Sequence, residues 1–184
     1  MGTVYEAEHT GLGSRVAVKL LTERFAEDQD ALERFKREAR ASAAVRHDNV
    51  VRVTDTGTDD EGVPFLVMEL LEGESLNAVL KRQRRLEPDA AAAVAYEVLD
   101  GLAAAHDKGI IHRDLKPGNV FLASEPDGTQ KAKILDFGIS KFGDDSVTRE
   151  LTAEGAVVGT PQYMPPEQVA GKKDLDARAD VYAV

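Results

Sequence analysis

Two short runs decide the fold, His112-Arg113-Asp114-Leu115-Lys116-Pro117-Gly118-Asn119 and Asp136-Phe137-Gly138. Together they supply a carboxylate that can accept a proton, a cation, and two side-chain oxygens of the kind that magnesium prefers. A loop aspartate alone is more often a turn former. The lysine, proline and asparagine that follow Asp114 favour a catalytic aspartate instead. In this order the two runs predict chemistry on a phosphate group.

These runs resemble the catalytic loop and the metal-binding turn of the eukaryotic-like Ser/Thr protein kinases, in particular the bacterial receptor-type and soluble members. The resemblance implies an α+β, bilobal fold, with a β-rich N-lobe over residues 1–71 and a helical C-lobe over residues 72–184. It also implies a kinase domain truncated at both ends, since Gly2 matches the last glycine of a phosphate-covering loop and Asp180 lies near the start of the helix that centres the C-lobe. We therefore expect the first strand and the C-terminal helices to lie outside this sequence, and we expect Asp180 to brace the catalytic loop.

The composition narrows the alternatives. The 184 residues carry a formal net charge of −10 and contain no cysteine. The acidic balance argues against a nucleic-acid partner, and the lack of cysteine excludes disulfides and thiolate zinc sites. The apolar stretch over 90–95 is far too short to span a bilayer, and no signal-peptide pattern opens the chain. We therefore expect a cytoplasmic segment without membrane contact, whose parent protein has room for an anchor elsewhere.

Hydrophobic periodicity predicts the secondary structure. Gly11 and Gly13 indicate a hairpin turn rather than half a nucleotide-binding loop, because no helix follows them. Asp30 and Glu33 fit a capping box at the start of the first helix. The expected hinge lies near residues 70–73. The predicted strands cover 3–8, 15–21, 50–53, 64–69, 110–111, 120–122 and 133–135, and the predicted helices cover 30–45, 75–84 and a segment from Pro88 to just before Gly109.

Four residues of the two runs are the expected catalytic and metal-binding groups. By resemblance, Asp114 orients the acceptor hydroxyl and takes its proton, while Lys116 neutralises the transferring phosphate. A lysine at this position marks Ser/Thr rather than Tyr specificity in the family. Asn119 and Asp136 are the expected magnesium ligands, since a hard cation prefers oxygen. Phe137 is expected to pack internally and to influence the direction of Asp136.

The nucleotide contacts are expected from strands and hinge. Lys19 resembles the lysine that holds the α- and β-phosphates of ATP, although a strand lysine alone is usually only solvated. Glu38 is its expected helix partner, with Glu27 and Glu33 as competing candidates. In the adenine pocket Met68 is the expected gatekeeper. The backbone groups of Glu69 and Leu71, in the hinge, are expected to contact the base. The resemblance assigns the remaining nucleotide contacts to Gly2, Val4, Ala17, Met68, Glu69, Leu71 and Phe121, while Leu135 fits either this pocket or the core.

The segment from Asp136 to Glu167 resembles an activation loop. Arg113, directly before Asp114, suggests control by loop phosphorylation, because a phosphothreonine offers strong acceptors to an arginine fork. Lys141 is expected to assist Arg113. The candidate acceptors are Thr152 first, then Thr148 and Ser146; the alternative is that these hydroxyls only solubilise the loop.

The resemblance implies ATP- and Mg²⁺-dependent phosphorylation of Ser or Thr in a protein substrate, with autophosphorylation included. A non-catalytic pseudokinase that acts as a scaffold is the second hypothesis. It is weakened by the intact set of polar site residues, but it regains weight because the glycine loop is incomplete. A small-molecule phosphotransferase of kinase-like fold is the third hypothesis. The Lys116-Pro117 pair and the segment 160–167 argue against it, since both resemble protein-substrate features.

Overall fold

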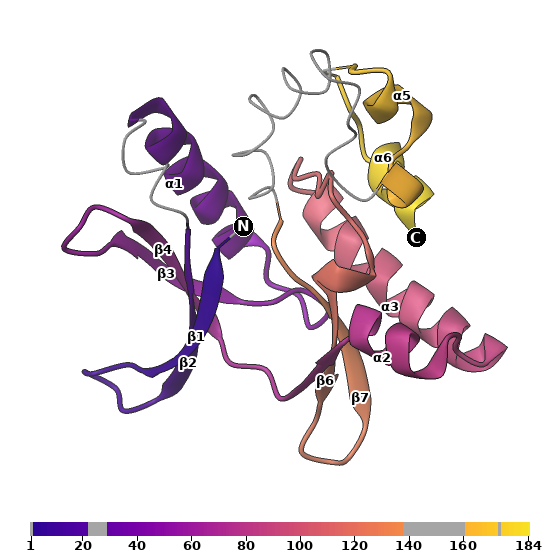
Figure 1. Cartoon of the computed structure of the whole chain (residues 1–184), viewed down its shortest axis with the longest axis horizontal. Coiled ribbons are helices and arrows are strands. Elements are labelled where there is room, and N and C mark those ends of the chain that lie inside the picture. Colours follow the sequence, from indigo (N-terminus) through magenta and orange to yellow (C-terminus); the bar gives the residue numbers. More distant parts are fainter. Residues whose placement is uncertain (1, 22–28, 138–160, 173) are drawn as a thin grey trace.

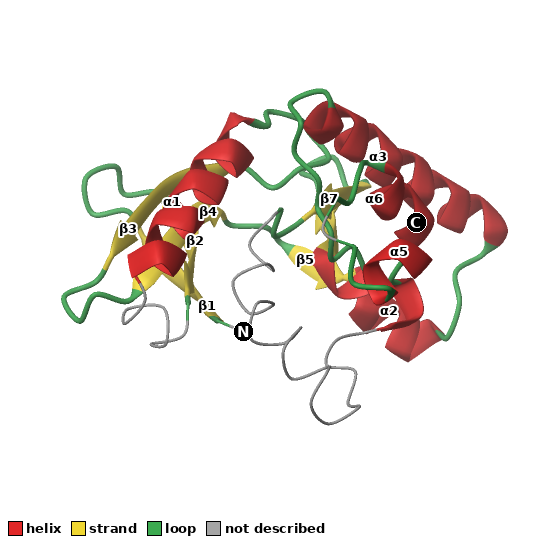
Figure 2. Ribbon diagram, turned by 90° about the horizontal axis from the view of Figure 1, so that it is seen from above, coloured by secondary structure: helices red, strands yellow, loops and turns green. Residues whose placement is uncertain are grey.

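The first part of the molecule is a four-stranded antiparallel sheet with one helix across a face (Figures 1 and 2). The computed structural model describes residues 2–21, 29–137, 161–172 and 174–184. We call this part the N-lobe. In the strand order β1-β2-β4-β3 it contains β1 (Thr3–Glu8), β2 (Arg15–Leu20), β4 (Pro64–Glu69) and β3 (Val53–Thr58), and its helix is α1 (Gln29–Ala44).

The helix α1 is held on the sheet by a small apolar cluster. Phe35 and Ala39 are fully buried and lie one helical turn apart, so they share the face that meets the sheet. They pack with Leu21, Val53 and Leu66 from the sheet side. This apolar face fixes how α1 lies on the strands.

The predicted start and inner face of this helix need two corrections. The helix begins at Gln29, so Asp30 lies inside it and cannot be the N-cap of a capping box. A helical period that places Phe35 and Ala39 inside also favours Ala43 there, but Ala43 is exposed, whereas Ser42 is 3% exposed. The face therefore turns by about one residue at its end, as a period of 3.6 residues allows.

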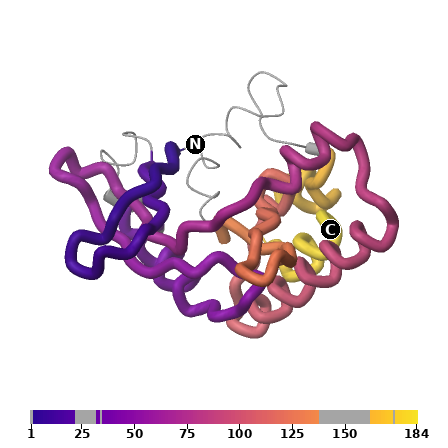
Figure 3. The backbone as a smooth tube through the Cα atoms, turned by 90° about the horizontal axis from the view of Figure 1, so that it is seen from below, coloured from indigo at the N-terminus to yellow at the C-terminus, as the bar shows by residue number. Residues whose placement is uncertain are grey.

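A second sheet and the remaining helices form what we call the C-lobe. Figure 3 shows the two lobes side by side, the N-lobe in indigo to purple and the C-lobe in magenta to yellow. The chain passes between them after β4, near the predicted boundary at 71/72, which stays a prediction. The sheet, in the order β5-β6-β7, contains β5 (Gly73–Ser75), β6 (Val120–Ser124) and β7 (Gln130–Ile134), and the helices are α2 (Leu76–Gln83), α3 (Pro88–His106), α5 (Pro166–Val169) and α6 (Arg178–Ala183), with 3-10 turns η2 (Pro117–Asn119) and η4 (Pro161–Tyr163).

The sequence predicted the long helices of this lobe better than its strands. The side chain of Ser75 caps α2 by accepting a hydrogen bond from the N–H of Ala78, and Pro88 starts α3 as predicted. The predicted strand at 110–111 is wrong, because this segment forms no strand, and β5 was not predicted. Within the described ranges, no helix combines the length and apolar character needed to cross a membrane.

The segment 49–52 joins the lobes and explains a further error. A strand was predicted over 50–53, but the third strand runs from Val53 to Thr58. Val50 instead forms an isolated parallel bridge with Ile134 of β7. The N–H of Ile134 donates to the carbonyl of Asn49 at 2.8 Å, and the N–H of Val51 donates to the carbonyl of Ile134 at 2.9 Å. We call residues 49–52 and β7 the seam.

We predict that Gly101→Ala destabilises the protein, although alanine is the better helix former by about 1 kcal/mol. A Cβ at position 101 of α3 would lie 2.9 Å from the carbonyl oxygen of Asn49 and 3.1 Å from Cδ1 of Ile134. Relieving that contact should cost more than the propensity gain, for a net loss of roughly 1–2 kcal/mol in urea unfolding.

The matched control is Ala103→Gly, at an exposed position of the same helix. It should cost about 1 kcal/mol through propensity alone. A Gly101→Ala protein more stable than wild type would show that α3 is not pressed against the seam.

Candidate active site

A buried carboxylate holds the start of the catalytic loop, residues 112–119. Asp180 of α6 is 1% exposed and accepts hydrogen bonds from the backbone N–H groups of His112 and Arg113, each at 2.8 Å. Its Oδ2 also lies 2.8 Å from Nε2 of His106, at the end of α3. Arg113 has φ +67°, which L side chains rarely adopt, so these bonds stabilise a strained backbone. The prediction that Asp180 braces the loop is confirmed.

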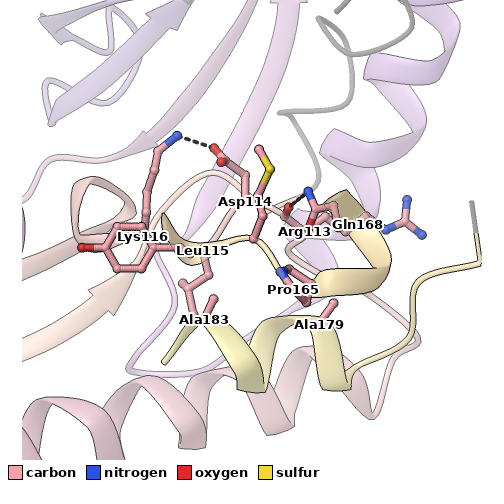
Figure 4. Close-up of a pocket in the computed structure, with 10 residues that line it drawn as sticks. Arg113, Asp114, Leu115, Lys116, Pro165, Gln168, Ala179 and Ala183 are labelled. Atoms are coloured by element: carbon pink, nitrogen blue, oxygen red, sulfur yellow. Dashed lines mark hydrogen bonds and ion pairs between the residues drawn. The ribbon is translucent and has the colours of Figure 1, made fainter. Parts of the chain in front are cut away.

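Asp114 lies in a polar cluster made by its own loop (Figure 4). Its Oδ2 lies 2.7 Å from Nζ of Lys116 and 3.2 Å from Nδ2 of Asn119. The Asn119 amide also donates to the carbonyl of Asp114 at 2.7 Å. The side chains of Asp114 and Lys116 are 28% and 15% exposed, so this carboxylate is partly shielded yet open to a reactant.

Asp136 joins this cluster from the turn after β7. Its Oδ2 lies 2.6 Å from Nζ of Lys19, which belongs to β2 of the N-lobe. The N–H of Leu135 donates to the carbonyl of Asn119 at 2.9 Å, which ties the turn to the catalytic loop. Asp136 has φ +60°, the second strained backbone position of the site. The structure thus gathers Asp114, Asn119, Asp136 and the lysine of the other lobe.

The His112 ring connects the two sequence runs. It is fully buried, and it lies 5.1 Å from the Phe137 ring, which is 1% exposed. Nδ1 accepts a hydrogen bond from the N–H of Asp114 at 3.2 Å, so Nε2 is the protonated nitrogen that donates to the carbonyl of Leu135 at 2.8 Å. Burial lowers the pKa of His112 below 6.5, against the opposing effect of the Leu135 carbonyl and nearby carboxylates. The ring therefore serves as a neutral spacer.

An apolar cluster lies beside the polar one and contains part of the predicted adenine pocket. Its buried members are Ala17, Val51 and Met68, and partly buried leucines pack against it. Of the other predicted pocket residues, Phe121 and Gly2 are half-buried, while Val4 is 57% exposed on β1. The assignment of the pocket stays a prediction. Of the residues predicted for it, the structure brings together Ala17, Met68 and Leu71, and Leu135, which fitted either the pocket or the core, packs against the same cluster.

The helix partner of Lys19 also stays a prediction. Glu38 is half-buried on α1, three residues after Phe35. The competing Glu33 is exposed and lies 3.0 Å from Lys36 on its own helix. Glu27 lies outside the described residues.

Below Asp114 the catalytic loop borders a small hollow, and Figure 4 shows its labelled residues converging. Gln168 donates to the carbonyl of Arg113 at 2.9 Å, which anchors α5, the helix that follows the segment 136–167 and includes its last two residues, to the loop. Lys141, Ser146, Thr148 and Thr152 lie outside the described residues, so the regulatory role of Arg113 stays a prediction. The hollow is lined by Arg113, Asp114, Leu115, Lys116, Tyr163, Met164, Pro165, Gln168, Ala179 and Ala183.

Among the contacts between distant elements that were not predicted, two involve side chains of the seam region and α3. Lys133 lies 3.0 Å from Glu69, and Nε2 of His47 lies 3.4 Å from Asp100. His47 thus lies near a carboxylate of α3, a contact that the sequence pattern did not indicate. The sequence did contain an indication for Lys133. A lysine next to an apolar run such as Ile134-Leu135 is expected to be partly buried, and a buried lysine needs an acidic partner.

The residues present fit a magnesium–nucleotide complex. Asn119 and Asp136 offer oxygen atoms, the ligand type of Mg²⁺, and Lys19 offers a cation for phosphate. No group of three His, Cys, Asp or Glu side chains suited to hold a metal occurs in the part of the chain that the structure describes. A bound Mg²⁺ would therefore complete its shell with water and phosphate oxygens, as this ion normally does.

Comparison with known proteins agrees with this arrangement. The model of the protein kinase domain matches residues 1–184. Serine/threonine-protein kinase pkn2 of Myxococcus xanthus is 45% identical over all of this chain and 22% of its own length. Probable serine/threonine-protein kinase PknB of Corynebacterium glutamicum is 42% identical, over 28% of its length, and serine/threonine-protein kinase PknA of Mycobacterium tuberculosis is 42% identical, over 42% of its length.

The fold comparison gives the same result. The crystal structure of the Mycobacterium tuberculosis PknI kinase domain aligns with a TM-score of 0.76 and 30% identity, over 100% of this chain and 64% of that one. The chain therefore belongs to the protein kinase family, and its relatives are bacterial enzymes named as serine/threonine-protein kinases. It spans less than half the length of these curated relatives.

We predict that Asp180→Ala lowers the free energy of unfolding by about 3 kcal/mol, because the N–H groups of His112 and Arg113 and the His106 ring lose their buried carboxylate partner. Urea unfolding followed by circular dichroism measures this loss. Asp176→Ala is the control, since Asp176 pairs with Arg178 at the surface, where water screens the pair, and its removal should cost far less. Equal losses in the two variants would reject the bracing role.

A second prediction concerns pH. The folded-state pKa of His112 lies below its ordinary 6.5, so the unfolded chain binds more protons there; the associated stability is present above that pH and is lost as the pH falls. His112→Gln removes this titration. The loss of stability between pH 7.5 and pH 5.5, measured by urea unfolding, should be smaller in the variant than in wild type. An equal or larger loss in the variant would contradict this.

Proposed function

We propose that this chain binds ATP with Mg²⁺ and transfers the γ-phosphoryl group to Ser or Thr hydroxyls of proteins, itself included. The observation that carries the proposal is the convergence of Asp114, Lys116 and Asn119 with the pair formed by Asp136 and Lys19. Each of these groups has a task in phosphoryl transfer. The use of ATP implies a cytoplasmic setting for the segment.

The residues act mainly by positioning and by charge. Asp114 accepts a hydrogen bond from the substrate hydroxyl, directs its oxygen toward the phosphorus atom and takes its proton. Lys116, already 2.7 Å from Asp114, balances the negative charge of the transferring group. Lys19 binds phosphate oxygens, and Asn119 and Asp136 hold the metal. When bound, Mg²⁺ neutralises the phosphates and stabilises the charge that develops on the leaving oxygen.

Activation-loop phosphorylation is the proposed control. Gln168 already fixes the carbonyl of Arg113, and the guanidinium is assigned to a loop phosphate, with Lys141 assigned to assist it. Thr152 is the first candidate acceptor, followed by Thr148. This assignment rests on the family pattern and on the position of Arg113 next to Asp114.

The test is a phosphorylation assay with the protein in its full natural length, Mg²⁺ and radiolabelled ATP. Asp114→Asn keeps the shape of the side chain but cannot take a proton, so we expect at least about a 100-fold loss of label transfer. Binding of a fluorescent ATP analogue should remain within a few-fold of wild type. Phosphosite mapping of the labelled wild type locates the acceptor hydroxyls.

Asp127→Asn is the matched control, since it makes the same chemical change in the exposed turn between β6 and β7 and should leave transfer unchanged. Equal label in the Asp114→Asn and wild-type samples would reject Asp114 as the proton acceptor. Nucleotide binding without any transfer by the wild type would favour the scaffold hypothesis.

A further inference from the structure

We propose that Lys133 is a positioning residue for the nucleotide. Through its ion pair with Glu69 it fixes the distance between the β4 and β7 walls of the apolar cluster. The inference rests on the proposed function, because it assigns the adenine ring to that cluster. Lys133 itself touches neither nucleotide nor metal in this account and acts through Glu69.

The ion pair is compact and well supported. Nζ of Lys133 lies 3.0 Å from Oε1 of Glu69, and the two side chains are only 12% and 20% exposed. The same oxygen accepts a hydrogen bond from the N–H of Arg52 at 2.9 Å, while the N–H of Glu69 donates to the carbonyl of Arg52 at 3.0 Å. One carboxylate oxygen thus holds a side chain of β7 and the backbone that precedes β3.

These contacts cross between the lobes. Glu69 is the last residue of β4 in the N-lobe sheet, and Lys133 belongs to β7 in the C-lobe sheet. Arg52 ends the seam segment 49–52, which is hydrogen-bonded to Ile134 next to Lys133. The ion pair therefore links β4 of the N-lobe sheet to both parts of the seam, namely β7 and the segment 49–52.

The pair also borders the predicted adenine pocket. Strand alternation turns Met68 away from the Glu69 side chain, into the cluster with Ala17 and Val51. Leu135, two residues after Lys133, packs against the same cluster from the C-lobe side. Any change in the separation of Glu69 and Lys133 therefore changes the separation of Met68 and Leu135.

A neighbouring pair supplies an internal comparison. Lys131 lies on the same face of β7 and contacts Asp48 at 3.1 Å, but these side chains are 34% and 83% exposed. Water screens such a pair, and its removal should have little effect. Removing one partner of a shielded pair leaves an uncompensated charge, so the Lys133 pair should matter far more.

The experiment measures the KM for ATP, the kcat and the melting temperature of the full-length protein. Lys133→Met should raise the ATP KM about 10-fold, the effect of removing one partner of a shielded pair, and change kcat by less than about 3-fold. Lys133→Arg, which keeps the charge, should restore the KM to within about 3-fold of wild type. Lys131→Met should leave both constants within about 2-fold.

If Lys133→Met does not fold, Glu69→Gln decides, because it keeps an acceptor for Arg52 and removes only the charge; it should raise the KM to a similar extent. The positioning role is overturned by an unchanged KM in the folded variant, by an equal rise in Lys131→Met, or by a fall in kcat and melting temperature alone. If the wild type transfers no phosphate, the proposed function is rejected instead. That outcome can be distinguished from an active wild type whose ATP KM equals that of Lys133→Met, which rejects only the positioning role.

Discussion

The carboxylate of Asp180 is the constraint on which the rest of the site depends. It accepts hydrogen bonds from two consecutive backbone amides and contacts the His106 ring, all in a position that is 1% exposed. Charge-assisted bonds of this kind are stronger than neutral ones and can hold the backbone of Arg113 at φ +67°. Because Asp114 follows directly, the direction of the proposed catalytic carboxylate is set by a residue 66 positions away along the chain.

The second constraint is the way in which the lobes are joined. The hinge after β4 is one connection, and the seam is another, since Asn49 and Val51 add backbone hydrogen bonds to Ile134. Gly101 allows α3 to press against the same segment, where its missing side chain leaves room for the carbonyl of Asn49. The lobes are thus connected at two places, the hinge and the seam, and the second connection limits how they can move relative to each other.

Local patterns predicted what local physics controls. The starts of α2 and α3 and the hairpin of β1 and β2 follow from nearby residues, and the two runs around Asp114 and Asp136 follow from a specific spacing. The strand predicted over 50–53 failed because Val50 bridges Ile134 of β7 and the N–H of Val51 donates to the carbonyl of Ile134, a long-range partner that periodicity does not reveal. The short strand β5 failed for the same reason, since its three residues are defined by pairing with β6. The ion pair of Lys133 with Glu69 joins residues 64 positions apart. The sequence could predict that Lys133 needs an acidic partner, but not which residue supplies it.

Two of the cross-lobe ion pairs, Lys19 with Asp136 and Lys133 with Glu69, would behave differently when a nucleotide binds as proposed. Lys19 would exchange Asp136 for phosphate oxygen, and Asp136 would exchange Lys19 for a metal, so that each charge keeps an opposite charge but their direct 2.6 Å contact is given up. Lys133 and Glu69 have no such task and can remain paired throughout. The lobes would then be held in register by the Lys133 pair and the seam while the Lys19 pair opens, and this is why the loss of Lys133 should appear in nucleotide affinity rather than in the rate of transfer.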